Sequence, residues 1–290
     1  MNNHTQSQHI SCILVLFNPV ETVLMTINKL VSTGYKVIIV INAAAEPIIT
    51  ALSKIRDLSI IHNTNNLGLA TALNMGIKHG FLVNQADFVA LFDQDSQPEH
   101  DQPLKLVNEM IDQGLKKIAC IGPKLMDIKN LSIPYSKDNC PVDNAKPKSI
   151  PTSGTVISKQ AWHDVGSMMD ELFIDGIDHE WCFRAYSKGY QVCVSTQTTM
   201  LHNLGDTHLN YFGQYKPVHR EPTRHFFIVR NALFLSSLKH LPLKWRVMEL
   251  IKTIRRIIFY IGVSSDRAKT LQLIRKALKD GLAGRLGPLA

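Results

Sequence analysis

Apolar runs closed by polar or turn-forming residues alternate, over most of the chain, with segments whose apolar positions recur at helical spacing. The near-continuous apolar runs predict buried strands at residues 10–17, 37–41, 58–61, 88–92, 118–122 and 152–157. The periodic segments predict helices at residues 20–33, 47–54, 102–113, 159–165 and 177–188. Strand–helix–strand repetition of this kind predicts an α/β fold with a doubly wound, mostly parallel sheet.

Two carboxylates follow the fourth apolar run, because Phe88–Phe92 leads directly into Asp93-Gln94-Asp95. Residues i and i+2 of an extended backbone point to the same side, so both acids can approach one cation. The carboxyl end of a parallel strand is also where open α/β sheets bind ligands. Hard oxygen ligands suit Mg²⁺ or Mn²⁺ held together with substrate phosphates. The alternative for an isolated Asp-x-Asp is a solvated acidic turn.

Small residues form a second signal, in which Gly68, Ala72 and Gly76 recur every four positions after the Asn-rich segment 63–66. A helix with such a stripe can lie close to a sheet or a ligand. The asparagines can cap this helix and offer amide groups to a sugar or a phosphate. A capped, tightly packed helix without a ligand is the alternative.

A second acidic segment contains Asp175, Asp178 and Glu180. The helix predicted from residue 177 places Asp178 in its first turn, where the helix dipole stabilises a carboxylate. Glu180 and Arg184 are four residues apart and are expected to pair with each other. Asp178 is then the candidate general base, and an N-terminal helix acid without chemistry is the alternative.

Charge and composition favour an anionic partner. The chain has 290 residues, a net charge of +8, 45% hydrophobic residues and 19% charged residues. A nucleotide, a nucleic acid or a membrane surface fits that charge. The five scattered cysteines include no Cys-x-x-Cys pair, which indicates neither a zinc knuckle nor a disulfide framework. We expect a cytosolic protein.

The last fifty residues interleave apolar and basic side chains. The basic positions are Lys244, Arg246, Lys252, Arg255 and Arg256. The most apolar run, Ile257–Val263, is far shorter than the roughly 20 residues that span a bilayer. A basic amphipathic helix is typical of a membrane surface or a partner interface, and a helix packed on the domain is the alternative.

Taken together, these motifs resemble the family 2 glycosyltransferases, specifically the bacterial rhamnosyltransferase branch that builds O-antigen and capsule. The resemblance runs from about Ile10 to Leu235. The motifs that carry it are Phe17-Asn18-Pro19, Asn66-Leu67-Gly68-Leu69-Ala70, Asp93 with Asp95, Asp178-His179-Glu180 with Arg184, His202, and Arg230-Asn231. It implies a GT-A glycosyltransferase domain over residues 1–235 and a C-terminal helical segment over residues 236–290 that associates with a membrane or packs on the domain.

The resemblance also implies roles for these residues. The residues expected to bind the donor are Phe17, Asn18, Asn42, Asn66, Gly68, Asp93 and Arg230. Asp93, Asp95 and His202 are expected to hold Mg²⁺ or Mn²⁺, and Asp178 is expected to act as the base. The second strand of the family usually ends in Asp-Asn, whereas this chain has Ile41-Asn42, so base recognition must differ or depend on Asn42. Ile177 replaces the acid that usually precedes the base and removes a like charge.

The implied reaction is inverting sugar transfer from a nucleoside diphosphate to a hydroxyl group, with dTDP-L-rhamnose as the expected donor. The expected acceptor is a lipid-linked saccharide at the cytoplasmic membrane surface, so the protein is expected to be peripheral at the inner face of the cell membrane, with a homo-oligomer possible.

A UDP-hexose donor is the alternative within the family. A sugar nucleotidyltransferase would need a Gly-rich phosphate loop with a basic residue where this chain has Phe17–Glu21. A nucleic-acid-binding protein lacks support from a helix-turn-helix, zinc or stacking-aromatic motif, and we expect no nucleic-acid partner.

Overall fold

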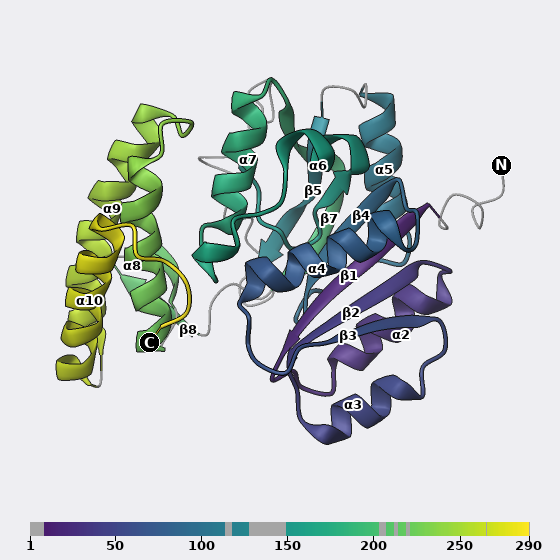
Figure 1. The fold of residues 1–290 in the computed structure, drawn as a ribbon, viewed down its shortest axis with the longest axis horizontal. Coiled ribbons are helices and arrows are strands. Elements are labelled where there is room, and N and C mark those ends of the chain that lie inside the picture. Colours follow the sequence, from purple (N-terminus) through teal and green to yellow (C-terminus); the bar gives the residue numbers. More distant parts are fainter. Residues whose placement is uncertain are drawn as a thin grey trace.

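The computed structural model describes residues 9–113, 118–127, 149–202, 207–211, 214–218, 221–264 and 266–289. A seven-stranded sheet covered by helices forms the larger part, and three long helices stand beside it (Figure 1). The loop expected over residues 131–149 lies outside the described residues except at its last residue, Ser149.

Four parallel strands form the first half of the sheet. They are β1 (Ile10–Phe17), β2 (Lys36–Ala43), β3 (Leu58–His62) and β4 (Phe88–Asp93), in the order β3-β2-β1-β4. Val15 of β1 lies opposite Asp93 of β4, and Phe17 lies opposite Ala43 of β2. The carboxyl ends of these strands therefore meet at one edge of the sheet.

The second half of the sheet is mixed. β6 (Val156–Ser158) runs antiparallel to both β4 and β5 (Ile118–Asp127), and β7 (Gln191–His202) runs parallel to β5. The complete order is β3-β2-β1-β4-β6-β5-β7. The expected α/β class with a mostly parallel sheet is confirmed.

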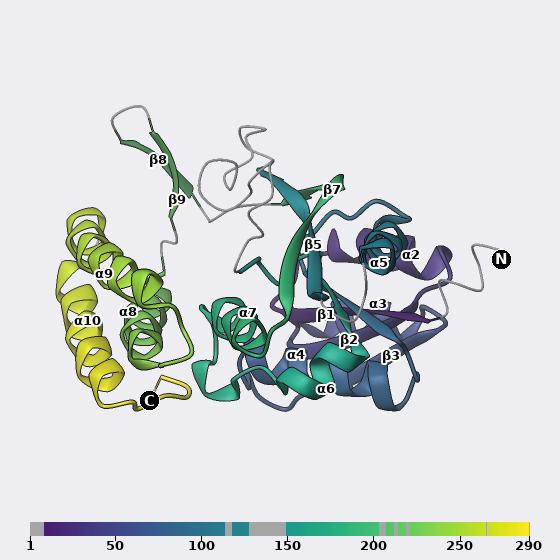
Figure 2. The same cartoon turned by 90° about the horizontal axis from the view of Figure 1, so that it is seen from above.

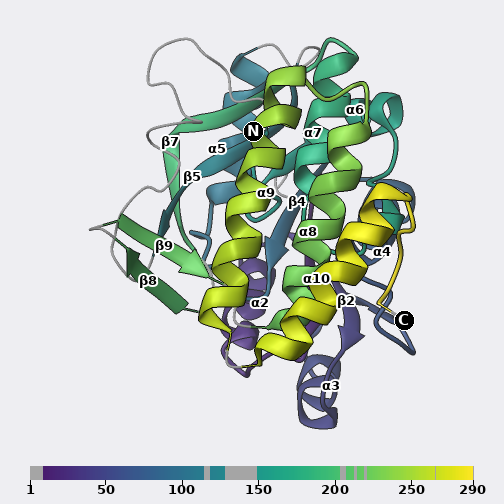
Figure 3. The same ribbon diagram turned by 90° about the vertical axis from the view of Figure 1, so that its left-hand side faces the viewer.

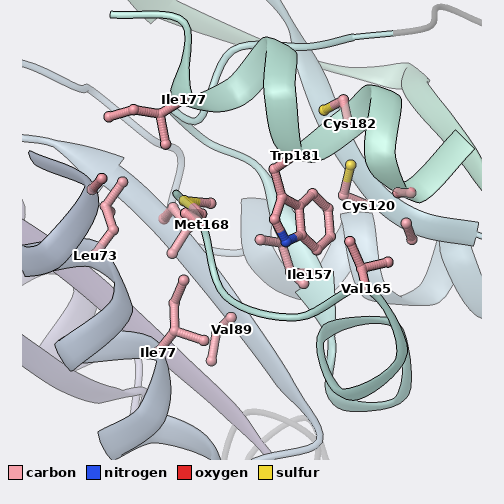
Figure 4. Packing of buried hydrophobic residues seen from close by; sticks show 14 of the residues in the cluster. Leu73, Ile77, Val89, Cys120, Ile157, Val165, Met168, Ile177, Trp181 and Cys182 are labelled. Carbon is pink, nitrogen blue, oxygen red and sulfur yellow. The ribbon is translucent and has the colours of Figure 1, made fainter. Parts of the chain in front are cut away.

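Helices cover both faces of this sheet, which explains why its strands are almost continuously apolar. The helices of one face are α2 (Val23–Ser32), α3 (Glu46–Ser53) and α5 (Gln102–Asp112). Those of the other face are α4 (Leu69–Leu82), α6 (Lys159–Val165) and α7 (Ile177–Ser187). Figure 4 shows Trp181 of α7 lying among Ile157, Val165 and Cys120 in the core beneath these helices.

The small-residue stripe of α4 faces the sheet. A Cβ atom on Gly76 would lie 2.5 Å from Cγ2 of Ile13, and Ala72 is fully buried. Gly68 precedes the helix, which begins at Leu69, and has a φ of 87°. The stripe therefore serves close helix–sheet packing, whereas Gly68 serves the turn into the helix.

The last three helices pack on one another. They are α8 (Pro222–Ser237), α9 (Leu243–Val263) and α10 (Arg267–Leu282), with a shared apolar cluster around Phe226, Val229, Tyr260 and Ile274. Figures 1 and 3 show α8 nearest the sheet, with α9 and α10 outside it. This helical unit begins at Pro222, ahead of the boundary expected near residue 235. A hairpin of β8 (Thr207–Tyr211) and β9 (Gln214–Val218) projects beside it (Figure 2).

Aromatic contacts join this unit to α7. Trp245 at the start of α9 lies edge-on to Phe183, with ring centroids 5.2 Å apart, and 5.6 Å from the His179 ring. Within the described part of the chain, none of the helices is long and apolar enough to cross a membrane.

Candidate functional site

The two carboxylates predicted to bind a metal lie at the carboxyl end of β4. Asp93 is half-buried and Asp95 is exposed. The turn between them is closed by the backbone N–H of Ser96, which donates to the Asp93 carbonyl at 3.0 Å, and by the Ser96 hydroxyl, which accepts from the Asp93 N–H at 3.0 Å. The buried Ser96 hydroxyl also contacts that of Ser153 at 2.6 Å. A packed serine therefore sets the backbone that presents both acids.

The residue between the acids ties this turn to β1. The Phe17 N–H donates to Oε1 of Gln94 at 2.9 Å, and the Asn18 N–H donates to the Ala43 carbonyl at 2.7 Å. Asn18 has a φ of 46°, so the chain turns sharply after the strand. The predicted donor residues Phe17 and Asn18 thus lie at the same sheet edge as the acids. Gln94 was not predicted, because an isolated glutamine carries no pattern.

Asn42 organises the segment that leads into α4. Its Nδ2 donates to Asn66 Oδ1 at 2.8 Å and to the Gly68 carbonyl at 3.2 Å. Its Oδ1 accepts from Asn63 Nδ2 at 3.1 Å and from the Leu67 N–H at 3.0 Å. An aspartate could not donate the first two bonds. Asn42 matches the asparagine of the expected Asp-Asn ending, and the departure lies at Ile41, whose side chain is 1% exposed in the core.

The turn at Gly68 contacts the second acidic segment. The Leu69 N–H at the start of α4 donates to the Phe173 carbonyl at 2.6 Å. A Cβ atom on Gly68 would lie 2.6 Å from the Phe173 ring. Glycine is therefore required both for the positive φ and for the close approach. This contact brings the predicted donor-binding turn beside the predicted catalytic segment.

The backbone that leads into α7 is strained. Phe173, Asp175 and Gly176 have φ angles of 66°, 64° and 83°. A non-glycine residue in this region costs about 1–3 kcal/mol and persists where surrounding contacts impose it. Asp178 follows in the first turn of α7, half-buried, and its Oδ1 accepts from the His179 N–H at 2.8 Å.

The other acids of this segment are held in ion pairs. Glu180 is fully buried, and both of its oxygens accept from the guanidinium of Arg184 at 2.8 Å, while Oε1 also contacts His240 Nε2 at 3.1 Å. Asp175 pairs with Arg224 at 3.2 Å. The Glu180–Arg184 pair is confirmed. Among the described residues no ion pair involves Asp178, which makes it the acid of this segment suited to take a proton.

The end of β7, where His202 lies, is next to the acid turn. His202 is the last residue of β7, and the preceding Leu201 forms an antiparallel bridge with Gln97, two residues beyond Asp95. The side chain of His202 lies outside the described atoms, so its predicted metal contact stays a prediction. No group of three potential ligand side chains gathers in the described parts of the chain. The carboxylates of Asp93 and Asp95 are nevertheless the oxygen donors that Mg²⁺ and Mn²⁺ prefer.

Arg230 lies buried on α8. Its side chain is 1% exposed, and Nη2 donates to the Leu172 carbonyl at 3.0 Å while Nε donates to Asn231 Oδ1 at 2.9 Å. Burial lowers the pKa of the guanidinium to about 10, so it stays charged at neutral pH. The geometry gives Arg230 a supporting contact with the segment that leads into α7, and its contact with the donor stays a prediction.

Comparison with known proteins agrees with this geometry. Residues 11–138 match the family model "Glycosyl transferase family 2". The dTDP-rhamnosyl transferase RfbF of Shigella flexneri is 28% identical over 295 residues, which cover 97% of this chain and 98% of that protein.

Solved structures show the same fold. TarS of S. aureus superposes with a TM-score of 0.61 at 15% identity over 94% of this chain, which spans about half (48%) of TarS. TarS 1–349 in complex with UDP-GlcNAc gives a TM-score of 0.60 at 14% identity and is covered to 80%. The chain is thus a glycosyltransferase with a GT-A fold, and its residues 11–138 are similar to the family 2 glycosyltransferase domain.

Proposed function

We propose that this protein is an inverting glycosyltransferase that moves L-rhamnose from dTDP-L-rhamnose to a hydroxyl group of a saccharide acceptor. The observation that carries the proposal is the similarity to a dTDP-rhamnosyl transferase, which extends over 97% of this chain. The UDP-GlcNAc complex of TarS keeps a UDP-hexose donor as the alternative, although that similarity supports the fold alone.

The donor occupies the carboxyl edge of the sheet in this proposal. Phe17 ends β1 and Asn18 follows it, near the end of β4 at Asp93, and the Phe17 N–H bonds to Gln94. Asn42 supports the turn of Asn66 and Gly68, whose backbone precedes α4. Open α/β sheets bind nucleotides at such an edge. Since the side-chain atoms of Asn42 already bond to protein groups, we assign it the role of holding this turn.

Asp178 performs the proton transfer in this proposal. The acceptor hydroxyl oxygen forms a bond to the anomeric carbon from the face opposite the nucleotide, and the bond between that carbon and the diphosphate oxygen breaks. The hydroxyl proton passes to the Asp178 carboxylate, and the nucleoside diphosphate leaves. A half-buried carboxylate at a helix N-terminus suits a general base. Its neighbours Asp175 and Glu180 are occupied by Arg224 and Arg184.

Asp93 and Asp95 would hold the divalent cation, with His202 as a further candidate ligand. The cation supplies positive charge to the departing diphosphate when it is bound. The two acids lie two residues apart at the end of one strand, and Ser96 holds the turn that joins them.

A donor screen tests the proposed function. Purified protein is offered dTDP-L-rhamnose, UDP-glucose and UDP-GlcNAc with a rhamnose-accepting saccharide, and nucleoside diphosphate release is measured with Mg²⁺, with Mn²⁺ and with a chelator. We expect release from dTDP-L-rhamnose that requires the metal. Release only from a UDP-sugar would show that the donor is not dTDP-L-rhamnose. Undiminished release in chelator would show that the reaction does not require a metal ion.

The acceptor in this proposal is a lipid-linked saccharide, and α9 holds the enzyme at the inner face of the membrane. Large apolar side chains recur on one outward face of α9, namely Leu243, Val247, Leu250, Ile251, Ile254 and Ile258, and each is at least 38% exposed. Exposed basic residues flank them at Lys244, Lys252 and Arg255. An exposed apolar stripe beside cations is complementary to an anionic lipid surface.

A further inference from the structure

The segment Leu172–Gly176 links the two halves of the candidate site. Its Phe173 carbonyl accepts from the first amide of α4, and the Gly176 carbonyl accepts from the Glu180 N–H at 3.0 Å, which forms the first turn of α7. Asp178 is two residues beyond Gly176. The position of this catalytic segment therefore sets where the Asp178 carboxylate lies.

One side chain of α8 bonds to most of the catalytic segment. Nδ2 of Asn231 lies 3.0 Å from the Leu172 carbonyl, 2.6 Å from the Ile174 carbonyl and 2.8 Å from the Asp175 carbonyl. Asn231 is 1% exposed. The same NH₂ group thus lies within hydrogen-bond distance of three carbonyl oxygens of this segment.

Arg230 orients that amide. Its Nε donates to Oδ1 of Asn231 at 2.9 Å, so the Asn231 oxygen faces the arginine and the NH₂ group faces the catalytic segment. Nη2 of Arg230 adds a bond to the Leu172 carbonyl, and its guanidinium lies 4.9 Å from the centroid of the Phe227 ring. Phe227 in turn stacks on Phe173 at 5.0 Å.

We propose that Asn231 is the positioning residue for Asp178: through its bonds to the catalytic segment it fixes the start of α7 and hence the proton-accepting carboxylate. This inference rests on the proposed role of Asp178 as the base. The positive φ angles at Phe173 and Asp175 are imposed by contacts. Asn231 bonds to the Asp175 carbonyl and Phe227 stacks on Phe173, beside the Arg224–Asp175 ion pair and the bond from the Leu69 N–H to the Phe173 carbonyl. The donor side has its own support in the Asn42 network, which Asn231 does not touch.

Asn231→Ala tests this role through the split between kcat and KM. Loss of the amide lets the catalytic segment shift, and a misplacement of about 1 Å at a catalytic group can cost roughly a hundredfold in rate. We expect kcat to fall at least about tenfold while KM for the donor changes less than about twofold. Ser236→Ala is the matched control, because Ser236 is a buried polar residue of the same helix whose hydroxyl bonds to Ala232 and Arg246.

Hydrogen exchange gives a readout that does not depend on transfer. In Asn231→Ala, the amides of residues 177–180 should exchange faster than in the wild type, while those of β1 and β2 keep their protection. Phe227→Leu, which removes only the ring stacked on Phe173, should shift the same amides less. If Asn231→Ala does not fold, the kcat and KM values and the hydrogen exchange are measured on Phe227→Leu.

Two results would overturn the positioning role. In the first, Asn231→Ala has a lower melting temperature but keeps the wild-type kcat when assayed well below that temperature. In the second, the KM for the donor rises by as large a factor as kcat falls. If the wild type transfers no sugar from any donor, the proposed function fails separately. Unchanged exchange at residues 177–180 would then reject the positioning role independently.

Discussion

At the scale of single residues, Asn42 shows how one amide at a strand end can hold a turn. Its side chain both donates to and accepts from the turn before α4. Asn42→Asp would retain the accepted bonds but lose the donated ones, leaving a buried carboxylate oxygen facing the oxygens of Asn66 and Gly68. We expect the free energy of unfolding to fall by about 1–3 kcal/mol. Urea unfolding measures this, with the exposed Asn108→Asp as control, and an unchanged midpoint would mean that the turn does not depend on Asn42.

Asp93 and Asp95 yield a prediction about metal dependence. Without a cation the two carboxylates repel each other, and with one they share its charge. Asp95→Ala should abolish the part of nucleoside diphosphate binding that requires Mg²⁺, and Asp93→Ala should come close to it. Calorimetric titration with and without the metal measures this difference. If Mg²⁺ strengthens nucleoside diphosphate binding equally in the wild type and in Asp95→Ala, these acids do not bind the metal.

Local patterns predicted the position of these acids but not the contacts that hold them. Asp93 and Asp95 could be located because an apolar run ends at them. The bond from Phe17 to Gln94 joins residues 77 positions apart, and the bond from Asn231 to Leu172 joins residues 59 apart. Neither pair leaves a periodic signal in the sequence. Nor could the sequence show that Arg230, part of the matched Arg-Asn motif, is buried and bonds to the Leu172 carbonyl.

At the scale of helices and strands, hydrophobic pattern was a reliable guide where both faces are covered. The strand predicted at residues 10–17 matches β1 (Ile10–Phe17), and the helix predicted at residues 159–165 matches α6. The pattern did not decide how the C-terminal helices pack. Trp245 belongs to the basic and apolar C-terminal segment, for which membrane association and packing on the domain were both open, and it packs on Phe183 of α7.

The predicted binding to membranes depends on the outward face of α9. Replacing Ile254 and Ile258, which are 61% and 69% exposed, with glutamine removes apolar surface without touching the packed side of the helix. Burial of each isoleucine in lipid is worth roughly 1.5–3 kcal/mol at most, so vesicle binding should weaken at least about tenfold. Co-sedimentation with vesicles of phosphatidylglycerol and phosphatidylcholine measures the bound fraction.

A matched surface substitution separates lipid binding from a general loss of apolar area. Leu82→Gln removes an apolar side chain that is 74% exposed at the end of α4 and should leave vesicle binding unchanged. High salt should release part of the wild-type protein from the vesicles. If the double variant sediments like the wild type, α9 does not bind lipid. A difference in molar mass in solution between the double variant and the wild type would instead identify α9 as a contact between copies of the chain.

At the scale of the whole molecule, the helical unit and the sheet form one structure around the catalytic segment. His240, between α8 and α9, contacts the buried Glu180 of α7, and Gly176 lies against Leu235 of α8. The carboxyl ends of β1 and β2 point toward the side on which these helices stand (Figure 1). Removing the chain after Lys239 would therefore expose the apolar side of α8, and α9 is better tested by surface substitutions than by truncation.

Transfer by Asp178→Asn tests the central claim most directly. Rhamnose transfer from dTDP-L-rhamnose is followed beside donor binding for the wild type, for Asp178→Asn and for the exposed control Asp112→Asn. An amide cannot accept the hydroxyl proton as a base, so turnover in Asp178→Asn should fall by roughly a hundredfold or more while donor affinity and melting temperature stay close to wild type. Turnover near the wild-type rate in Asp178→Asn would contradict the account, because the proton would then be taken elsewhere.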